Sequence, residues 1–332
     1  MAGPELTLIA PAYNEAPNIR PLYEAVLKVL EPAGISFELL FIDDGSRDGT
    51  DAEIALLVAA DPRVRYARFS RNFGHEAASS CGFRLARGQA VVLIDADLQD
   101  PPEVILELHQ RWREGYEVVH ARRRQRHGET WLKRASAYLF YRGFNRMVER
   151  AIPADVGDFR LVDRRVVDHF NALPERNRFV RGMFSWLGFR QTVVEFDRQR
   201  RQRGVTKYNY SKLLWLSLDA LTSFSAAPLR ACMAFGLAIT LFSFLIAGTI
   251  IFQRLFFDLA VPGYALATSG IFLLGGIQLI FLGVIGEYIG KIYTQVQGRP
   301  LYIVAGSSDD LPPAPTKETA DPSPESHPPG RS

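Results

Sequence analysis

The sequence predicts an α/β domain on a doubly wound, mostly parallel sheet, followed by two helices that cross a membrane. Short apolar runs alternate with segments of helical periodicity as far as Ala121, which is typical of strands joined by crossover helices. Acidic and turn-forming residues follow several of these runs. Farther on, residues 231–253 and 259–286 carry no charge, and each run exceeds the roughly 20 residues that span a bilayer core.

The elements of the domain follow from local pattern in chain order. Strands are expected where apolar runs are bounded by turn residues, and helices where apolar residues recur every three to four positions. The expected strands are 6–10, 37–42, 64–69, 90–94 and 117–121, and the expected helices are 19–30, 50–60, 75–86 and 104–113. This alternation calls for parallel strands with helices on both faces of the sheet.

Two later segments, 131–150 and 208–224, interleave apolar residues with Lys and Arg. Basic amphipathic helices of this kind lie in a membrane interface. By pattern alone, packing on the domain's own core fits each segment equally well. The two uncharged runs that begin just after the second segment favour the interface.

The charge distribution sets the expected topology. Basic residues flank the two spans, whereas their connection holds only Arg254 and Asp258, so the positive-inside rule places both ends in the cytoplasm. No signal peptide is recognised at the N-terminus. We expect a multi-pass protein of the inner (cytoplasmic) membrane, with its catalytic domain and both termini cytoplasmic. The expected units are a cytoplasmic domain at 1–225, a membrane domain at 229–304 with spans near 231–253 and 263–288, and a tail at 305–332.

Composition limits the classes of function. The formal net charge is +3, and the tail is acidic, so the rest of the chain carries +6, which suits a membrane surface with anionic head groups. We expect no nucleic-acid partner. The 2 cysteines indicate neither a disulfide nor a metal knuckle. The tail holds seven prolines and one large aliphatic residue, Leu311, and is expected to be disordered.

Three expected strands end in polar sequences: "APAYNE" from Ala10, "IDDGS" from Ile42 and "DADLQD" from Asp95. The carboxyl ends of parallel strands form the ligand-binding edge of such a sheet. Asp95 and Asp97 lie two apart, so on an extended segment they point to the same side, where a cation relieves their repulsion. Oxygen ligands select Mg²⁺ or Mn²⁺, which bridge to phosphates. An Asp-x-Asp pair alone is usually a solvated turn, but its place at a strand end beside two others makes it a metal site.

The usual phosphate-binding loops are absent from the sequence. No Gly-x-Gly-x-x-Gly follows the first strand, and no Gly-x-x-x-x-Gly-Lys-Ser/Thr occurs. The charge of a diphosphate must therefore be neutralised by the metal and by cationic side chains.

The motifs "PAYNE", "DDGSRDGT", "SRNFGHEAA", "DADLQDPP", "GDFRLVDR", "GVTKY" and "RPLYIV" occur in this order from the first strand to Val304. In this respect the chain resembles family 2 glycosyltransferases, which have a GT-A-like fold. More narrowly, it is similar to the polyisoprenyl-phosphate glycosyltransferases, such as dolichol-phosphate mannose synthase and undecaprenyl-phosphate glucosyltransferase.

The resemblance implies a set of site residues. Asp158 is the candidate catalytic base, with Asp97 as a second catalytic residue, and Asp95, Asp97 and Gln99 are the metal ligands. Arg123 and Arg126 are expected to contact the acceptor phosphate. The nucleotide sugar is expected to contact Pro11, Tyr13, Glu15, Asp43, Asp44, Asp95, Ala96, Asp97, Gln99, Arg201 and Lys207.

Several of these roles have alternatives. A phosphomonoester has a second pKa of about 6 and is mostly dianionic at neutral pH, so a base gains little. Asp158 can instead orient the acceptor, or pair with a nearby Arg. Either Asp43 or Asp44 can simply form the turn that follows it. His75 is either a phosphate ligand or the support of its helix.

The resemblance implies a metal-dependent, inverting transfer of a sugar from a nucleotide donor, UDP-glucose by preference, to undecaprenyl phosphate, with Mg²⁺ or Mn²⁺ as cofactor. GDP-mannose or an amino-deoxy sugar as donor is the alternative. A processive polysaccharide synthase fits less well, because two spans are too few to line a pore. A non-catalytic membrane scaffold is the remaining class. The expected partners are the donor, the lipid acceptor and the bilayer, and a homo-oligomer is left open.

Overall fold

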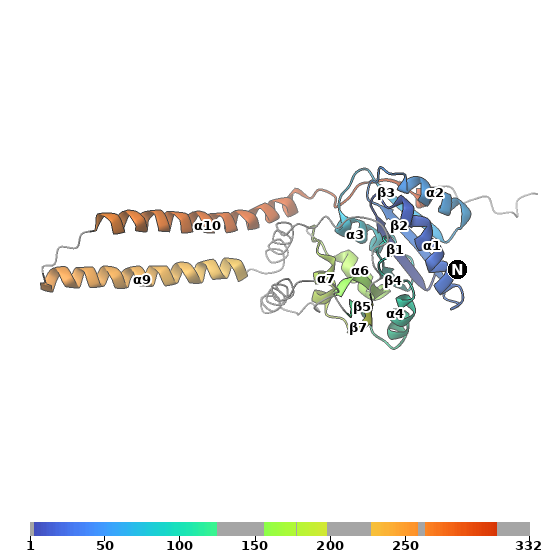
Figure 1. Ribbon diagram of the computed structural model, residues 1–332, viewed down its shortest axis with the longest axis horizontal. Coiled ribbons are helices and arrows are strands. Elements are labelled where there is room, and N and C mark those ends of the chain that lie inside the picture. The colour runs from blue at the N-terminus through green and yellow to red at the C-terminus, as the bar shows by residue number, and fades with distance from the viewer. Residues whose placement is uncertain (1–2, 125–155, 177, 198–226, 258–262, 311–332) are drawn as a thin grey trace, which may run out of the picture.

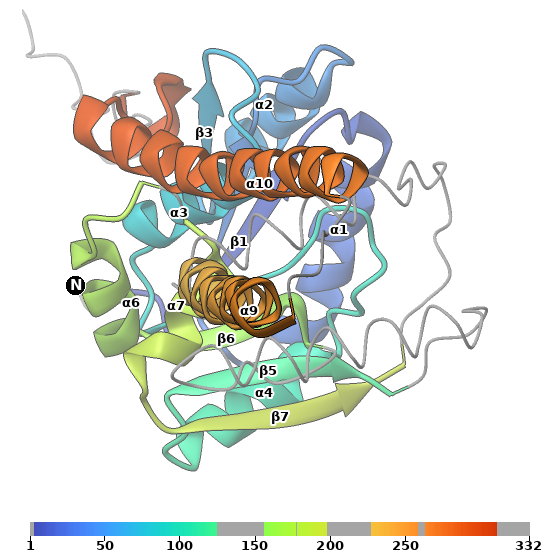
Figure 2. The same cartoon turned by 90° about the vertical axis from the view of Figure 1, so that its left-hand side faces the viewer.

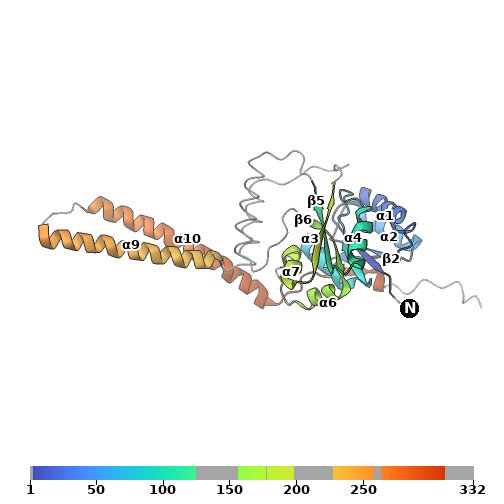
Figure 3. The ribbon, with the colours of Figure 1, turned by 90° about the horizontal axis from the view of Figure 1, so that it is seen from below.

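The computed structural model of the chain describes residues 3–124, 156–176, 178–197, 227–257 and 263–310. An α/β domain occupies one end of the molecule, and two long helices extend from it side by side (Figures 1 and 3). The expected interfacial segments, 131–150 and 208–224, lie outside the described residues.

The described strands form one sheet in the order β7-β5-β6-β4-β1-β2-β3-β8. Strands β1, β2, β3 and β4 pair in parallel, as do β5 and β7, so the mostly parallel sheet is confirmed. Strand β6 runs antiparallel to both of its neighbours, and β8 runs antiparallel to β3. The strands are β1 Leu6–Ala12, β2 Phe37–Asp43, β3 Val64–Phe69, β4 Ala90–Leu93, β5 Val118–Arg123, β6 Val156–Asp163, β7 Gln191–Phe196 and β8 Val304–Ser307.

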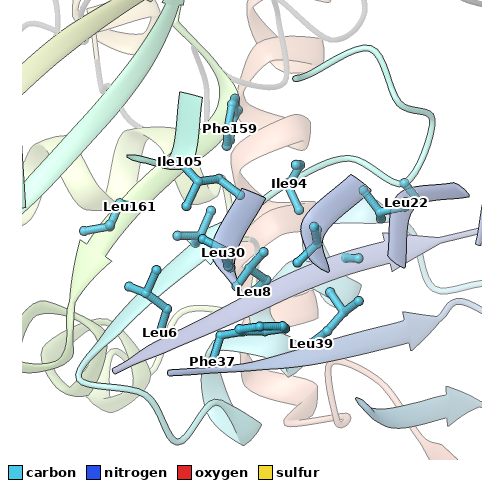
Figure 4. Close-up of a cluster of buried hydrophobic side chains, with 14 of the residues drawn as sticks. Leu6, Leu8, Leu22, Leu30, Phe37, Leu39, Ile94, Ile105, Phe159 and Leu161 are labelled. Carbon is cyan, nitrogen blue, oxygen red and sulfur yellow. The ribbon is translucent and has the colours of Figure 1, made fainter. Parts of the chain in front are cut away.

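Helices cover both faces of the sheet because the strands are apolar on both sides. Leu8 of β1 packs in the same cluster as Leu22 of α1 and Ile105 of α4 (Figure 4). Its neighbour Ile9 faces the other way and packs with Phe83 of α3. The helices of the domain are α1 Ala16–Leu30, α2 Thr50–Ala60, α3 His75–Leu85, α4 Val104–Arg113, α6 Arg164–Ala172 and α7 Val180–Leu187.

The two long helices are α9, Ala227–Phe257, and α10, Tyr264–Gln297. Each contains a window long and apolar enough to cross a bilayer, and neither window is buried within the protein. The 34 residues of α10 correspond to about 51 Å, which exceeds the roughly 30 Å of a bilayer core. The helix extends nine residues beyond the predicted span end at 288, and its last turn touches the domain. There Gln295 Nε2 donates to the carbonyl of Pro174 (3.0 Å).

The predicted start of the tail at residue 305, and the predicted end of the membrane domain at 304, both need correction. Residues Val304–Ser307 form β8 on the edge of the sheet, followed by a short 3-10 turn, Ser308–Asp310. Asp309 then pairs with Arg65 (2.7 Å) and Arg87 (3.1 Å). The chain therefore returns from α10 to the domain. A four-residue "VAGS" run has little strand character of its own, and its place depends on the edge of β3 and on these ion pairs.

Candidate functional site

The loop after β1 is fixed by the loop after β2. The N–H of Asn14 donates to Ser46 Oγ (2.9 Å), and the N–H of Glu15 donates to Thr50 Oγ1 (3.0 Å). Asn14 has a φ of 56°, a left-handed conformation that Asn tolerates better than most residues. Tyr13 is left 46% exposed on this loop. The "PAYNE" segment thus presents an aromatic ring at the carboxyl edge of the sheet on a well-defined backbone.

Asp43 and Asp44 are both buried at the end of β2. Asp43 Oδ1 accepts the N–H of Ser46 (2.9 Å) and forms the turn, as one of the two was expected to do. Asp44 instead accepts the N–H groups of Phe73 (2.6 Å) and Gly74 (2.9 Å). Burial raises the pKa of Asp44 despite these bonds. Asp44 therefore holds the loop that leads into α3. Pro11, another predicted donor contact, is buried within β1.

The "DADLQD" segment turns sharply after β4. Asp97 Oδ1 accepts the N–H of Gln99 (3.1 Å), and Leu98 between them has a φ of 59°, a strained value for a residue with a branched side chain. Asp95 and Asp97 are partly exposed, whereas Ala96 and Gln99 are buried. The turn is thus held in an uncommon conformation beside the predicted metal ligands.

The donor set of this turn fits a hard divalent cation only in part. Asp95 and Asp97 supply carboxylate oxygens and Gln99 an amide oxygen, the ligand types that Mg²⁺ accepts. Among the residues that the structure describes, no group of three or more His, Cys, Asp or Glu side chains is arranged to hold a metal. Such a cation would therefore take its remaining ligands from water and from the phosphates of a bound nucleotide.

Asp158 lies on β6. The register of that strand places it at the edge of the sheet where β4 leads into Asp95 and Asp97, here called the acidic rim. Arg160 pairs with Leu93 of β4 in the antiparallel ladder, so continuing the register places Asp158 opposite Asp95. Arg181 of α7 grips the carboxylate with two hydrogen bonds, Nε to Oδ1 and Nη2 to Oδ2, both 2.7 Å. His75, the first residue of α3, has its Nε2 3.5 Å from Oδ2.

The electrostatics of this cluster follow from the cations around Asp158. Burial alone would raise the pKa of Asp158, but the hydrogen bonds from Arg181 and His75 hold it well below its ordinary value. Burial likewise opposes the charged form of His75, yet Asp158 and the negative charge of Asp95 raise its pKa to about 9. These carboxylates therefore favour the charged form of His75. A carboxylate so strongly paired is a weak base, which favours the positioning alternative for Asp158.

A buried guanidinium supports this cluster from below. Arg160 is fully buried, and it donates from Nε to the carbonyl of Asp158 (3.0 Å) and from Nη2 to that of Gly157 (2.9 Å). Burial lowers its pKa to about 10. Glu76 accepts the N–H of Val180 (3.1 Å), which ties the start of α7 to the start of α3. Arg160 thus fixes the backbone around Asp158, and Glu76 fixes the two helices that carry His75 and Arg181.

The remaining predicted residues are only partly placed. Arg123, at the end of β5, lies against β6, where its Nη2 is 3.5 Å from the position of a Cβ built on Gly157. Arg126, Arg201 and Lys207 lie outside the described residues.

The sequence did not single out Arg181 or Arg160. Arg181 is the one charged residue of the short helix α7, and its partner, Asp158, lies 23 residues earlier in the sequence. Arg160 lies inside the "GDFRL" motif and was the only one of the two with a local signal.

Comparison with known proteins gives a consistent result. Residues 7–170 match the model of the family described as Glycosyl transferase family 2. The "Uncharacterized glycosyltransferase sll0501" of Synechocystis is 47% identical, over 91% of this chain and 95% of that protein. The SfII prophage-derived bactoprenol glucosyl transferase of Shigella flexneri is 43% identical, over 91% and 98%. The prophage bactoprenol glucosyl transferase homolog of Escherichia coli is 41% identical, over 90% and 98%.

Proposed function

Because the chain belongs to glycosyltransferase family 2, we propose that it transfers a sugar from a nucleotide donor to a polyprenyl phosphate at the cytoplasmic face of a membrane. The observation that carries this proposal is the meeting of Asp95 with the Asp158, Arg181 and His75 cluster on one edge of the sheet. Relatives named bactoprenol glucosyl transferases, which match almost end to end, support a lipid phosphate as acceptor and glucose as the sugar.

The donor is proposed to lie along the loops after β1, β2 and β4. Tyr13 offers an exposed ring, and Asp43 Oδ2 is buried without a hydrogen bond, with Arg68 Nε 3.4 Å away. A carboxylate oxygen in this state can accept an N–H from a base, and both uracil and guanine present one. The names of the relatives favour UDP-glucose, and GDP-mannose or an amino-deoxy sugar is the alternative.

Asp95, Asp97 and Gln99 would hold Mg²⁺ or Mn²⁺, which when bound neutralises charge on the departing diphosphate. The acceptor phosphate oxygen forms a bond to the anomeric carbon while the bond from that carbon to the donor diphosphate breaks. One displacement of this kind inverts the configuration at the carbon. The acceptor is mostly a dianion at neutral pH, so no proton has to be removed from it.

The chain's own contribution is then electrostatic and positional. Asp158 fixes the side chains of Arg181 and His75, so these two cationic groups are held in place where the phosphates must approach each other. In a partly buried site such fixed charges need no reorganisation during the reaction. Asp158 is accordingly a positioning residue in this proposal.

Helices α9 and α10 are proposed to cross the membrane, with the domain and both termini in the cytoplasm. The start of α9 and the end of α10 both lie on the domain side of the helix pair (Figure 1). This arrangement would bring the head group of an apolar acceptor toward the domain.

The test is a donor panel with purified full-length protein, undecaprenyl phosphate, and Mg²⁺ or Mn²⁺. UDP-glucose, UDP-galactose, UDP-N-acetylglucosamine and GDP-mannose are each scored for labelled lipid, with and without EDTA. We expect product from UDP-glucose that EDTA abolishes, loss of product in Asp97→Asn, and normal product in Glu107→Gln, an exposed carboxylate on α4. Product from GDP-mannose alone would replace the proposed donor. No product from any donor, with intact membrane insertion, would favour the scaffold.

A further inference from the structure

A cavity of about 590 Å³ lies where the chain leaves α10 and returns to the sheet. Three parts of the chain line it: the second half of α3, the end of α6 with residues 173–176 and 178 that follow it, and residues 298–304, here called the return segment. None of the predicted donor, metal or catalytic residues that the structure describes lines it. In the view along the long helices, the domain end of α10 lies next to α3 (Figure 2), and Gln295 of its last turn contacts Pro174.

The cavity wall is positively charged. Arg84, Arg176 and Arg178 line it, and Glu175 is the one acidic residue among its described lining residues. Within the described part of the chain, the side chains of Arg84 and Glu175 form no hydrogen bond or ion pair. The wall therefore carries a surplus of positive charge without a compensating contact for Arg84.

Arg178 is held in place by neutral groups. Its Nη2 donates to the carbonyl of Leu173 (2.8 Å), its Nε donates to the carbonyl of Glu175 (3.1 Å), and it lies over the ring of Phe170. Burial lowers the pKa of Arg178; the charge of Glu175 opposes this shift, and that of Arg84 adds to it. Arg84 and Arg178 line the same cavity, so an anion held between them would offset the charge of both.

The size and place of the cavity narrow the anion's chemistry. Pockets of roughly 300–1,000 Å³ hold small-molecule ligands, and the forked guanidinium matches phosphate oxygens in pairs. Arg176 donates its backbone N–H to Gln295 Oε1 (2.9 Å) in the last turn of α10. If α10 crosses the membrane, the cavity lies beside the cytoplasmic end of that helix and so faces the membrane surface, where anionic lipids are enriched.

We propose that this cavity binds a phosphate group through Arg84 and Arg178, at a site separate from the reaction centre. A bound phosphate would bridge α3 and the segment after α6, and that segment contacts the last turn of α10 through Arg176 and Gln295. Its place at the end of a membrane helix points to a lipid head group as the source, and free phosphate has the same chemistry. Binding of a phosphate at this cavity does not depend on the chain being a sugar transferase.

The test measures binding to the full-length protein in detergent, without any sugar donor. Native mass spectrometry compares phosphatidylglycerol with phosphatidylcholine, and thermal shift with inorganic phosphate provides the second arm. Arg84→Gln and Arg178→Gln are the test variants, and Lys28→Gln, which removes an exposed charge on α1, is the matched control. The apolar helices bind lipid non-specifically, so the readout is the difference between variants.

We expect the affinity for phosphatidylglycerol to fall roughly tenfold in each test variant, the loss of one charge-assisted contact, with no change in Lys28→Gln. Stabilisation by inorganic phosphate that also depends on Arg84 would support the site and identify free phosphate as its source. Arg84→Lys, which keeps the charge, should retain part of the binding and so controls for misfolding. If phosphatidylglycerol and inorganic phosphate each bind the wild type and the two Gln variants with the same affinity, the proposal is overturned, whatever the result of the donor panel.

Discussion

The ion pair between Asp158 and Arg181 gives a prediction that separates the two roles of Asp158. Its two hydrogen bonds of 2.7 Å are charge-assisted, and such bonds contribute about 1.5–3 kcal/mol each. The side chains are 15% and 32% exposed, so water screens part of this interaction. We therefore expect a coupling of about 2–3 kcal/mol between the two residues, below the gross sum of the bonds.

The assay is a double-mutant cycle on kcat/KM for lipid glycosylation with Asp158→Asn, Arg181→Gln and the double variant. If Asp158 acts by positioning Arg181, each single variant should lose about 30- to 150-fold in kcat/KM, and the double variant should lose little more. The same cycle on Arg164 and Asp168, a looser pair at 3.8 Å, is the control and should give a coupling below about 0.5 kcal/mol.

The opposite outcome is equally specific. If Asp158 were the general base, removing Arg181 would raise the pKa of Asp158 and make it a stronger base at neutral pH. Arg181→Gln would then keep or gain activity, while Asp158→Asn alone would lose it. That pattern would refute the positioning role.

Three further predictions concern stability. His75, whose pKa is raised to about 9, stabilises the fold fully below its unfolded pKa of about 6.5 and loses this contribution as the pH rises through 9. Thermal unfolding in metal-free buffer should therefore show a falling melting temperature between these values, and a fall that persists in His75→Gln would contradict this cause. Asp309→Asn should weaken the attachment of β8 by about 1–2 kcal/mol, seen as faster hydrogen exchange at residues 304–307 but not in β6. Gly45→Ala should be more damaging than Gly49→Ala: both have positive φ, but a Cβ on Gly45 would lie 2.5 Å from the backbone of Arg71, whereas Gly49 faces open space. Equal melting temperatures for the two Ala variants would show that the close approach is relieved.

The first five strands and their helices could be predicted from the sequence because each has a local pattern. An apolar run such as "VVLI" at residues 91–94 is followed by a turn sequence, and the structure differs from these predictions mainly at the element ends. Strand β6 lacks such a signal. Its buried Arg160 lies between Phe159 and Leu161 in the sequence. A charged residue interrupts the short apolar run, so the pattern does not predict a strand there.

The candidate site was predictable only where its residues follow one another in the chain. The "DADLQD" turn contains its own carboxylates, so its place at a strand end could be inferred. The partners of Asp158 come from α3 and α7, and no spacing rule connects His75, Asp158 and Arg181. Their meeting depends on β6 entering the sheet antiparallel beside β4, which is a property of the tertiary fold.

Helix α3 connects the candidate functional site with the return segment. It begins with His75 at the acidic rim, and Cys81, in its middle, contacts Tyr302 of the return segment, whose ring stacks on Phe69 (4.9 Å). A domain attached to membrane helices through one connection would rotate freely about it. A second attachment through the return segment and β8 restricts that rotation, because the segment is held by the last strand of the sheet as well as by α3. If α9 and α10 cross the membrane, the contacts of the return segment and β8 therefore set how the edge of the sheet that carries Asp95 and Asp158 is oriented toward the lipid surface.

Asp309→Asn should then lower the apparent affinity for the lipid acceptor while leaving the affinity for the nucleotide donor unchanged, which acceptor titration and donor-binding calorimetry would measure. A parallel loss of both affinities would mean that β8 supports only the stability of the sheet.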